Sequence, residues 1–183
     1  MKYYWYYNQD FFSKKELKML NELIIKNKNT NWVDGNAKHS SKNCEVIISD
    51  YNKCKSILNK AVEYLYYINN TIFGFDIYNI TDHNKIFLNI YNSKDNASYD
   101  FHLDGESREQ PYTSKLTCLI NTSEEKYEGG EFVIFSGKEI EIKEFSIPGS
   151  ILIFPSIFFH AVKPVTKGIR KSVAMWGFGQ HWR

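Results

Sequence analysis

The spacing of apolar residues divides the chain near Gly74 into a helical first part and a second part made of short strands. Three apolar residues recur at helical spacing early in the chain and predict a helix that ends near Asn27. Ser13 and Glu16 precede this run with the spacing of a capping box, in which the two side chains satisfy free backbone amides at a helix start. The apolar stripe of this first helix consists of Leu17, Leu20 and Ile24.

A second helix is predicted to begin near Asp50 or Asn52 and to end just before Gly74, a residue type common after helix ends. Between the two helices, the polar segment from Asp34 to Asn43 predicts a loop and Cys44–Ser49 predicts a strand. The apolar stripe of the second helix consists of Ile57, Leu58, Ala61, Val62, Leu65 and Ile68.

After residue 85 the apolar runs are short, and Asn, Gly, Pro and Ser separate them, as is typical of β-strands. The predicted strands are Ile86–Tyr91, Tyr99–Asp104, Lys115–Ile120, Glu131–Phe135, Glu139–Lys143, Ile151–Phe154, Phe158–Val162 and Ser172–Phe178. This pattern predicts an α+β, mainly β fold: a double-stranded β-helix of the jelly-roll or cupin-like type with an N-terminal helical layer. A β-sandwich with a helical layer is the alternative. We expect one domain over residues 1–183, with 1–74 as a largely helical support and 75–183 as the jelly-roll core.

Charge and cysteine content narrow the function classes. The chain has 23 Lys and Arg against 21 Asp and Glu, a net charge of +2, which excludes a strongly basic nucleic-acid binder. Its three cysteines include no CxxC motif, which argues against a disulfide framework or zinc ribbon and favours a reducing, cytoplasmic location. The segment from Phe145 to Val162 has no charged residue, but Pro, Gly and Ser interrupt it, so it predicts a buried hairpin and no membrane span.

Two histidines have neighbours that suggest a metal site. His102 and Asp104 are separated by one residue on a predicted strand, so their side chains share one face. His160, in a late and uncharged segment, is the best third ligand. Two histidines and one carboxylate form the facial triad of non-haem Fe(II) oxygenases. Taken alone, a His-x-acid triplet is common, and a single histidine in an apolar strand is more often a core residue.

The segment after His160 strengthens this interpretation. Turn signals at Pro164 and Gly168 predict a hairpin whose return strand carries Arg170 and Ser172 on one face, close to His160. A buried arginine beside a metal needs an anionic partner. A dicarboxylate cosubstrate would supply one, accepting a bidentate pair of hydrogen bonds from Arg170 and another from Ser172.

On these residues the sequence resembles the 2-oxoglutarate/Fe(II)-dependent dioxygenases, specifically the prolyl 4-hydroxylase-like group, over about half of the chain. The matching motifs, in order, are Phe101–Asp104, Gly129–Phe135, Pro148–Phe154, His160–Val165 and Gly168–Arg170. The resemblance implies that His102, Asp104 and His160 are the iron ligands. It also implies that Arg170 holds the cosubstrate carboxylate and that Ser172 assists it.

The resemblance further implies that Tyr91 lines the metal and cosubstrate pocket. The chain departs from the group on the predicted strand after the His-x-Asp motif, where some prolyl hydroxylases place a tyrosine that holds the cosubstrate. This strand, Lys115–Asn121, has no tyrosine, and Thr117 is the candidate substitute. The departure weakens the prediction of prolyl specificity but does not affect the metal triad.

The function implied is hydroxylation of an unactivated C–H bond, with release of succinate and CO2. The implied cofactors are Fe(II), 2-oxoglutarate and O2, with ascorbate as a reductant. The favoured substrate is a prolyl residue in a peptide or protein, and a free amino acid or small metabolite is the alternative. A non-redox cupin-like metal-binding or isomerase domain, or a purely structural sandwich, would compete with this reading. Neither a nucleic acid nor a membrane is expected as a partner, and residues 92–100 and 105–114 are candidate lids.

Overall fold

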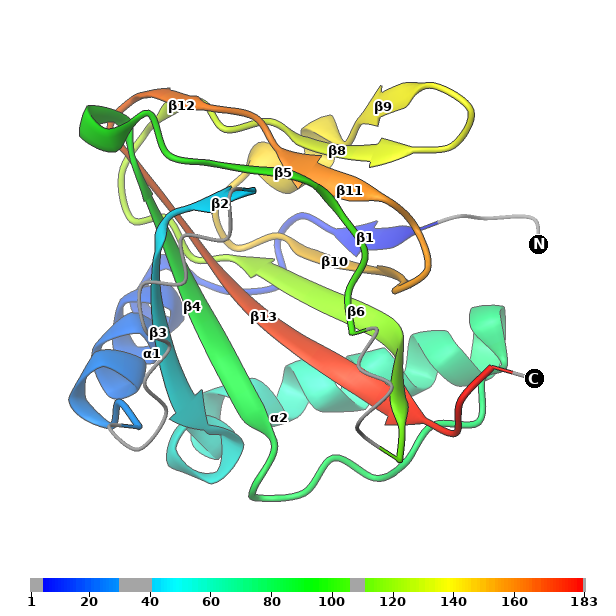
Figure 1. Cartoon of the computed structure of the whole chain (residues 1–183). Helices are drawn as coiled ribbons and strands as arrows, with labels where there is room; N and C mark the ends of the chain where they lie inside the picture. Colours follow the sequence, from blue (N-terminus) through cyan, green and yellow to red (C-terminus); the bar gives the residue numbers. More distant parts are fainter. Residues whose placement is uncertain (1–4, 30–40, 106–110, 183) are drawn as a thin grey trace.

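The structure consists of stacked layers, seen from the side in Figure 1: two helices, a large sheet and a smaller sheet that faces it. This computed structural model describes residues 5–29, 41–105 and 111–182. The predicted loop from Asp34 to Asn43 and the predicted lid from Gly105 to Ser114 therefore lie partly outside the described residues.

Within the described ranges, six antiparallel strands form the larger sheet, which we call the major sheet. Across it the order is β1 (Tyr6–Asn8), β10 (Ile151–Pro155), β6 (Thr113–Asn121), β13 (Ile169–Gly179), β4 (Lys85–Asn92) and β3 (Glu45–Asp50). Side chains alternate between the two faces of a strand. The central strand β13 therefore turns Val173 and Met175 towards the helices and Ala174 towards the smaller sheet.

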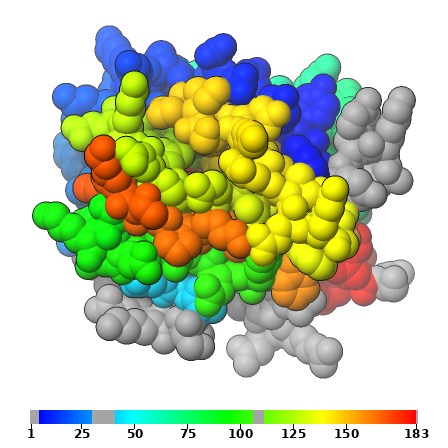
Figure 2. Space-filling view, turned by 90° about the horizontal axis from the view of Figure 1, so that it is seen from above, coloured from blue at the N-terminus to red at the C-terminus, as the bar shows by residue number. Residues whose placement is uncertain are grey.

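Counting only described residues, the smaller or minor sheet has five antiparallel strands. Their order is β2 (Lys42–Asn43), β5 (Ser98–His102), β11 (His160–Val162), β8 (Phe132–Phe135) and β9 (Glu139–Glu141). Figure 2 looks onto this side of the molecule, where segments of the minor sheet form the surface. A separate ribbon pairs β7 (Glu128–Gly129) with β12 (Val165–Lys167). Two facing antiparallel sheets with helices on one outer face confirm the predicted double-stranded β-helix.

Both predicted helices are present. The first, α1 (Lys14–Lys26), begins with the predicted capping box at Ser13. The second, α2 (Tyr51–Ile68), continues into one π-helical turn (Asn69–Phe73). It ends at Gly74, whose φ of 70° lies in the left-handed region that a glycine adopts without a Cβ penalty.

The helical layer is joined to the major sheet by an apolar core. Lys60 of α2 also pairs with Glu16 of α1 at 2.6 Å, and this contact, with hydrogen bonds from Ser13, lowers the pKa of Glu16 to about 2. Fully buried members of this core include Leu20, Ile24, Leu58, Leu65, Leu88, Leu116, Ile120 and Val173. Burial of each such side chain contributes about 1.5–3 kcal/mol, so the two helices hold the outer face of the major sheet firmly.

Most strands follow their predictions to within a few residues, and one difference matters for the site. β5 ends at His102, two residues before the predicted end at Asp104, because its partner β11 begins at His160, directly opposite His102. The short strands β2, β7 and β12 were not predicted, since two or three residues show no alternation. The predicted loop 92–100 holds a 3-10 turn (Ser93–Asp95) and the start of β5, and a second 3-10 turn (Lys143–Ser146) follows β9.

The two predicted hairpins are wrong. The uncharged segment Phe145–Val162 was expected to form one hairpin, but its two strands, β10 and β11, lie in different sheets. The second expected hairpin, from His160 to Arg170, fails for the same reason, because β11 and β13 also lie in different sheets. Turn residues indicate where a chain reverses but do not determine which strands pair, and here the chain crosses between sheets. In the described ranges, no helix combines the length and the apolar character that crossing a bilayer requires.

The close approach of the N-terminal segment to Gly149 generates a prediction. The amide of Phe12 donates to the carbonyl of Gly149 at 3.0 Å, and Gly149 has a φ of 91°. A Cβ at this position would overlap the carbonyl oxygen of Phe12. We therefore expect Gly149→Ala to lower the free energy of unfolding by roughly 2–5 kcal/mol, from left-handed strain plus the clash, as measured by urea denaturation.

Gly137 provides the matched control. It also has a positive φ, of 75°, but a Cβ there would meet no atom within 4 Å. Gly137→Ala should therefore cost only the backbone strain of about 1–2 kcal/mol. Equal losses in the two variants would contradict the role assigned to this contact.

Candidate active site

The two candidate histidines are brought together by strand pairing. His102, the last residue of β5, lies directly opposite His160, the first residue of β11. Residues opposite one another on antiparallel strands project to the same face. Their imidazole ring centroids are 4.1 Å apart, in the space between the two sheets.

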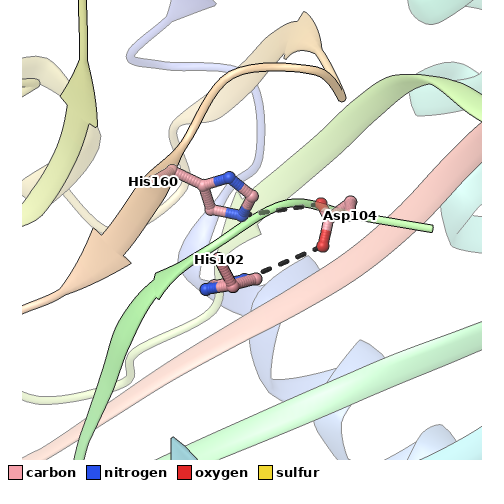
Figure 3. Close-up of side chains that lie close together, drawn as sticks. All are labelled: His102, Asp104 and His160. Atoms are coloured by element: carbon pink, nitrogen blue, oxygen red, sulfur yellow. Dashed lines mark ion pairs between the residues drawn. The ribbon is translucent and has the colours of Figure 1, made fainter. Parts of the chain in front are cut away.

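Asp104 joins the two histidines from beyond the end of β5. Its Oδ1 lies 3.8 Å from Nε2 of His102, and its Oδ2 lies 3.5 Å from Nε2 of His160. Figure 3 shows the three side chains pointing towards one another. The prediction that the His102 and Asp104 side chains lie close together is therefore met. The reason given for it is wrong, because Asp104 is not on the strand and the two residues do not share a strand face. Three candidate ligand atoms lie within 4.8 Å of one another, and among the described residues this is the one such cluster.

Backbone carbonyls determine the tautomer of each histidine. Nδ1 of His102 lies 2.8 Å from the carbonyl of Asp100, and Nδ1 of His160 lies 2.9 Å from the carbonyl of Phe158. A carbonyl oxygen only accepts, so each Nδ1 carries the proton and each Nε2 presents its lone pair to the other ligands. Burial and the neighbouring His160 lower the pKa of His102 to about 4, so this imidazole is neutral at pH 7. A neutral imidazole is the form that binds a metal.

A cavity of about 190 Å³ extends from the three side chains to Arg170. The Arg170 side chain is 1 % exposed and donates from Nη1 to the hydroxyl of Ser172 at 3.3 Å, while its Nε has no hydrogen-bond partner. Among the described residues, no carboxylate pairs with this guanidinium. Arg170 reaches the cavity from β13 in the major sheet, and so approaches the histidines across the two sheets and not through the predicted hairpin.

Tyr91 lies beside Arg170 on the neighbouring strand β4. The two residues are paired in register, and the Arg170 guanidinium carbon is 5.2 Å from the centre of the Tyr91 ring. Complete burial raises the pKa of the Tyr91 phenol well above its usual value, so the hydroxyl keeps its proton. The structure therefore brings all six predicted residues, including Ser172, to one cavity.

Asn89 and Trp176 are among the polar residues of this cavity that the sequence analysis missed. Asn89 is 7 % exposed, and neither its Oδ1 nor the buried indole Nε1 of Trp176 has a hydrogen-bond partner among the described residues. Both could have been found from strand alternation. Asn89 is two residues before Tyr91, and Trp176 is four residues after Ser172, so each shares a face with a predicted site residue.

Thr117 does not take the place of the missing cosubstrate tyrosine. Its hydroxyl lies 2.7 Å from Oδ2 of Asp104, on the metal side of the cavity. At the other end of β6, Asn121 donates to the hydroxyl of Tyr127 at 3.0 Å and to the carbonyl of Phe145 at 2.8 Å. The proposed substitution is therefore wrong, and Asn89 is the additional polar side chain beside Ser172, its register partner.

A second hollow adjoins this cavity, with two lining residues in common. It has a volume of about 840 Å³ and shares Phe87 and Trp176 with the first cavity. Its outer wall includes the aromatic side chains of Tyr78, Tyr112 and Phe178, and the rings of Tyr112 and Phe178 are 5.0 Å apart. We call this hollow the aromatic groove.

Two imidazoles and a carboxylate between the sheets of a double-stranded β-helix form the arrangement typical of non-haem Fe(II) oxygenases. The donor types, the inward-facing Nε2 atoms and the Arg170 guanidinium, which has no carboxylate partner among the described residues, all fit an iron ion with an anionic cosubstrate. The model of the 2OG-Fe(II) oxygenase superfamily matches residues 86–178, half of the chain. The chain belongs to this superfamily, and family membership implies Fe(II), 2-oxoglutarate and O2.

Curated relatives include the PKHD-type hydroxylase YbiX of Escherichia coli and of Shigella dysenteriae. Each is 32% identical over an alignment of 91 residues, and the match covers 45% of this chain and 39% of the relative. The match thus spans about two fifths of these relatives' length. The prediction of an oxygenase-class enzyme is confirmed at the level of the family.

Solved structures confirm the fold across nearly the whole chain. A prolyl-4-hydroxylase of Pseudomonas putida has a TM-score of 0.71 at 17% identity, covering 99% of this chain and 95% of its own. The viral collagen prolyl hydroxylase of Paramecium bursaria Chlorella virus-1, in a 2OG complex, has a TM-score of 0.69 at 20% identity, with 97% of both chains covered. These likenesses establish a shared double-stranded β-helix.

The geometry of the three side chains predicts a metal-binding phenotype. We expect His102→Ala to weaken Fe(II) binding by roughly 100-fold or more, because loss of a ligand should exceed the 10–100-fold effect of losing an outer partner. Anaerobic equilibrium dialysis measures the affinity. His83→Ala, which removes an exposed histidine of the aromatic groove, is the control and should bind Fe(II) as the unaltered protein does. Unchanged binding by His102→Ala would rule out this ligand assignment.

Proposed function

We propose that this chain is an Fe(II)- and 2-oxoglutarate-dependent hydroxylase that acts on an unactivated C–H bond of a prolyl residue in a peptide or protein. In this proposal His102, Asp104 and His160 hold the iron. One observation carries it: a fully buried Arg170, which has no carboxylate partner among the described residues, lies at the far end of the cavity that contains the three candidate ligands. A buried unpaired charge is costly, and an anionic ligand would remove that cost.

The cosubstrate is assigned to the other end of the same cavity. Arg170 offers its guanidinium to the distal carboxylate of 2-oxoglutarate, with the Ser172 hydroxyl and the Tyr91 ring beside it. When bound, Fe(II) and 2-oxoglutarate supply the oxidising step, in which O2 is consumed, 2-oxoglutarate becomes succinate and CO2, and one oxygen atom enters the substrate as a hydroxyl. The apolar walls at Leu119 and Phe132 keep bulk water away from this step.

A non-redox metal-binding or isomerase domain needs no such arginine. The proposal includes ascorbate as the reductant that keeps the iron ferrous. It also includes a single functional domain, in which residues 1–74 support the jelly-roll core. None of the three cysteines, which all lie in the described ranges, is in a disulfide. The cytoplasmic location stays a prediction.

The aromatic groove supports a peptide as the substrate. Its 840 Å³ greatly exceeds what a free amino acid would fill, and it opens beside Phe87 and Trp176, next to the candidate metal site. Aromatic-lined grooves are a recurring way to bind extended proline-rich segments, whose rigid backbone loses little entropy on binding. Among solved structures of this fold, a Trichoplax adhaerens prolyl hydroxylase is in complex with a peptide fragment of hypoxia inducible factor.

The activity has a direct test. With Fe(II), 2-oxoglutarate, O2 and ascorbate, we expect succinate to form in proportion to hydroxylated product when a mixture of proline-containing peptides is added. Liquid chromatography with mass spectrometry measures both products. If neither peptide mixtures nor small-metabolite mixtures support succinate formation, the proposed function is wrong; product from metabolites alone would replace the peptide substrate with a small molecule.

The cosubstrate site predicts a selective defect. We expect Arg170→Ala to raise the 2-oxoglutarate concentration for half-maximal rate by roughly 10–100-fold, because hydrogen bonds to a charged group contribute about 1.5–3 kcal/mol. Arg170→Lys keeps the charge but loses the bidentate geometry, so its 2-oxoglutarate requirement should lie between those of the unaltered protein and Arg170→Ala. Thermal melting checks that each variant is folded. A folded Arg170→Ala protein with the normal 2-oxoglutarate requirement would contradict this role.

The aromatic groove predicts a defect confined to the substrate. We expect Tyr112→Ala to raise KM for the reactive peptide by about 3–10-fold, because aromatic contacts contribute about 0.5–1.5 kcal/mol. The 2-oxoglutarate requirement should not change. Tyr67→Ala removes a tyrosine that is 61% exposed on α2 and does not line the groove, so it is the matched control. A change in KM shared by both variants, or absent from both, would count against this groove.

A further inference from the structure

Two buried hydroxyl groups connect Asp104 to the major sheet. The Thr117 side chain, fully buried on β6, places its Oγ1 2.7 Å from Oδ2 of Asp104. The Ser156 side chain, 1 % exposed just after β10, places its Oγ 2.9 Å from the same Thr117 oxygen. β6 and β10 are paired in register up to Leu116 and Pro155, so the backbone determines where both hydroxyls lie.

The number of protons available determines which group donates in each of these two hydrogen bonds. An ionised carboxylate has only acceptor sites, and a threonine hydroxyl has a single proton. The Thr117 proton therefore goes to Asp104, and Thr117 can only accept at its contact with Ser156. Ser156 must be the donor there, so the chain of hydrogen bonds runs from Ser156 through Thr117 to Asp104.

The orientation of the Asp104 side chain depends on its hydrogen bond with Thr117 more than the orientation of either histidine depends on a single hydrogen bond. His102 and His160 are held by strand pairing, and each also donates from Nδ1 to a carbonyl. Asp104 lies beyond the last paired residue of β5. In the described part of the chain, its Oδ2 accepts from Thr117 while its Oδ1 accepts no hydrogen bond, so the two oxygens are not equivalent.

We propose that Thr117 and Ser156 are positioning residues that orient the Asp104 carboxylate and set the metal affinity of the site. The inference rests on the proposed function, since it requires Asp104 to be a metal ligand. Thr117 restrains one oxygen of the carboxylate and leaves the other free for the metal. Partners of this kind usually change metal affinity by about 10–100-fold when removed.

The test compares two threonines that are equally buried. Thr117→Val removes the hydroxyl bonded to Asp104. Thr122→Val makes the same chemical change at a residue that is also 0% exposed but whose Oγ1, among the described residues, has no hydrogen-bond partner. We expect Thr117→Val to weaken Fe(II) binding by about 10–100-fold, whereas Thr122→Val should bind as the unaltered protein does. Anaerobic equilibrium dialysis measures the affinity.

A spectroscopic measurement separates orientation from general damage. Co(II) in place of Fe(II) has visible absorption that reports the arrangement of its ligands, and we expect this spectrum to change in Thr117→Val but not in Thr122→Val. Thr117→Ser keeps the hydroxyl and should retain both affinity and spectrum. Ser156→Ala removes only the donor to Thr117, so its loss of affinity should be smaller than that of Thr117→Val.

The outcomes distinguish this inference from the proposed function. If the unaltered protein binds neither Fe(II) nor Co(II), the proposed function fails together with the inference. If it binds them and Thr117→Val binds as tightly with an unchanged Co(II) spectrum, only the inference is overturned. If Thr117→Val does not fold, Ser156→Ala decides: unchanged affinity and spectrum in that variant overturn the Ser156–Thr117 chain, and weakened binding supports it.

Discussion

The interior of this protein is organised around a buried guanidinium that has no carboxylate partner in the part of the chain that the structure describes. Arg170 is 1 % exposed, and aromatic faces provide part of what an anion would: its guanidinium carbon lies 5.2 Å from the Tyr91 ring centre and 5.6 Å from that of Phe145. The backbone also passes close to the arginine, because a Cβ on Gly130 would lie 2.8 Å from Cδ of Arg170. A glycine at position 130 is therefore required by the buried arginine, whereas a Cβ on Gly129 would instead overlap the carbonyl oxygen of Pro164.

The strands of the major sheet pack against the helices with one face and line the candidate active site with the other. On β4, Ile86 and Leu88 pack against the helices, while Asn89 and Tyr91 line the cavity. Alternation with a period of two keeps these roles apart without any separate structure for the site. The apolar core under the helices then supplies the stability, and the face towards the minor sheet can tolerate polar atoms that lack partners, such as Oδ1 of Asn89.

Local patterns predicted much of this arrangement, and strand pairing accounts for what they missed. The capping box at Ser13 and the end of α2 at Gly74 depend on neighbouring residues, so the sequence was sufficient for them. The ordered motifs likewise contain four of the predicted site residues, His102, Asp104, His160 and Arg170, and the resemblance added Tyr91 and Ser172; all six line the cavity. The route of Arg170 into the site was mistaken because a turn signal does not specify which sheet receives the next strand. The contact between Thr117 and Asp104 joins β6 to a residue beyond the end of β5, and no local pattern contains the relative placement of these two segments.

Different physical constraints act on the metal site and on the aromatic groove. His102 and His160 occupy paired positions, and burial between two sheets leaves few residues that could replace Arg170. By contrast, Tyr78 is 43% exposed and Tyr112 is 36% exposed, so these groove residues can be exchanged with little effect on the core. Proteins that share this fold at 17–20% identity can therefore keep the residues of the metal and cosubstrate site while the residues of the groove differ. For that reason the substrate has to be inferred from the groove of this chain, since the substrates of proteins that share its fold reflect their own grooves.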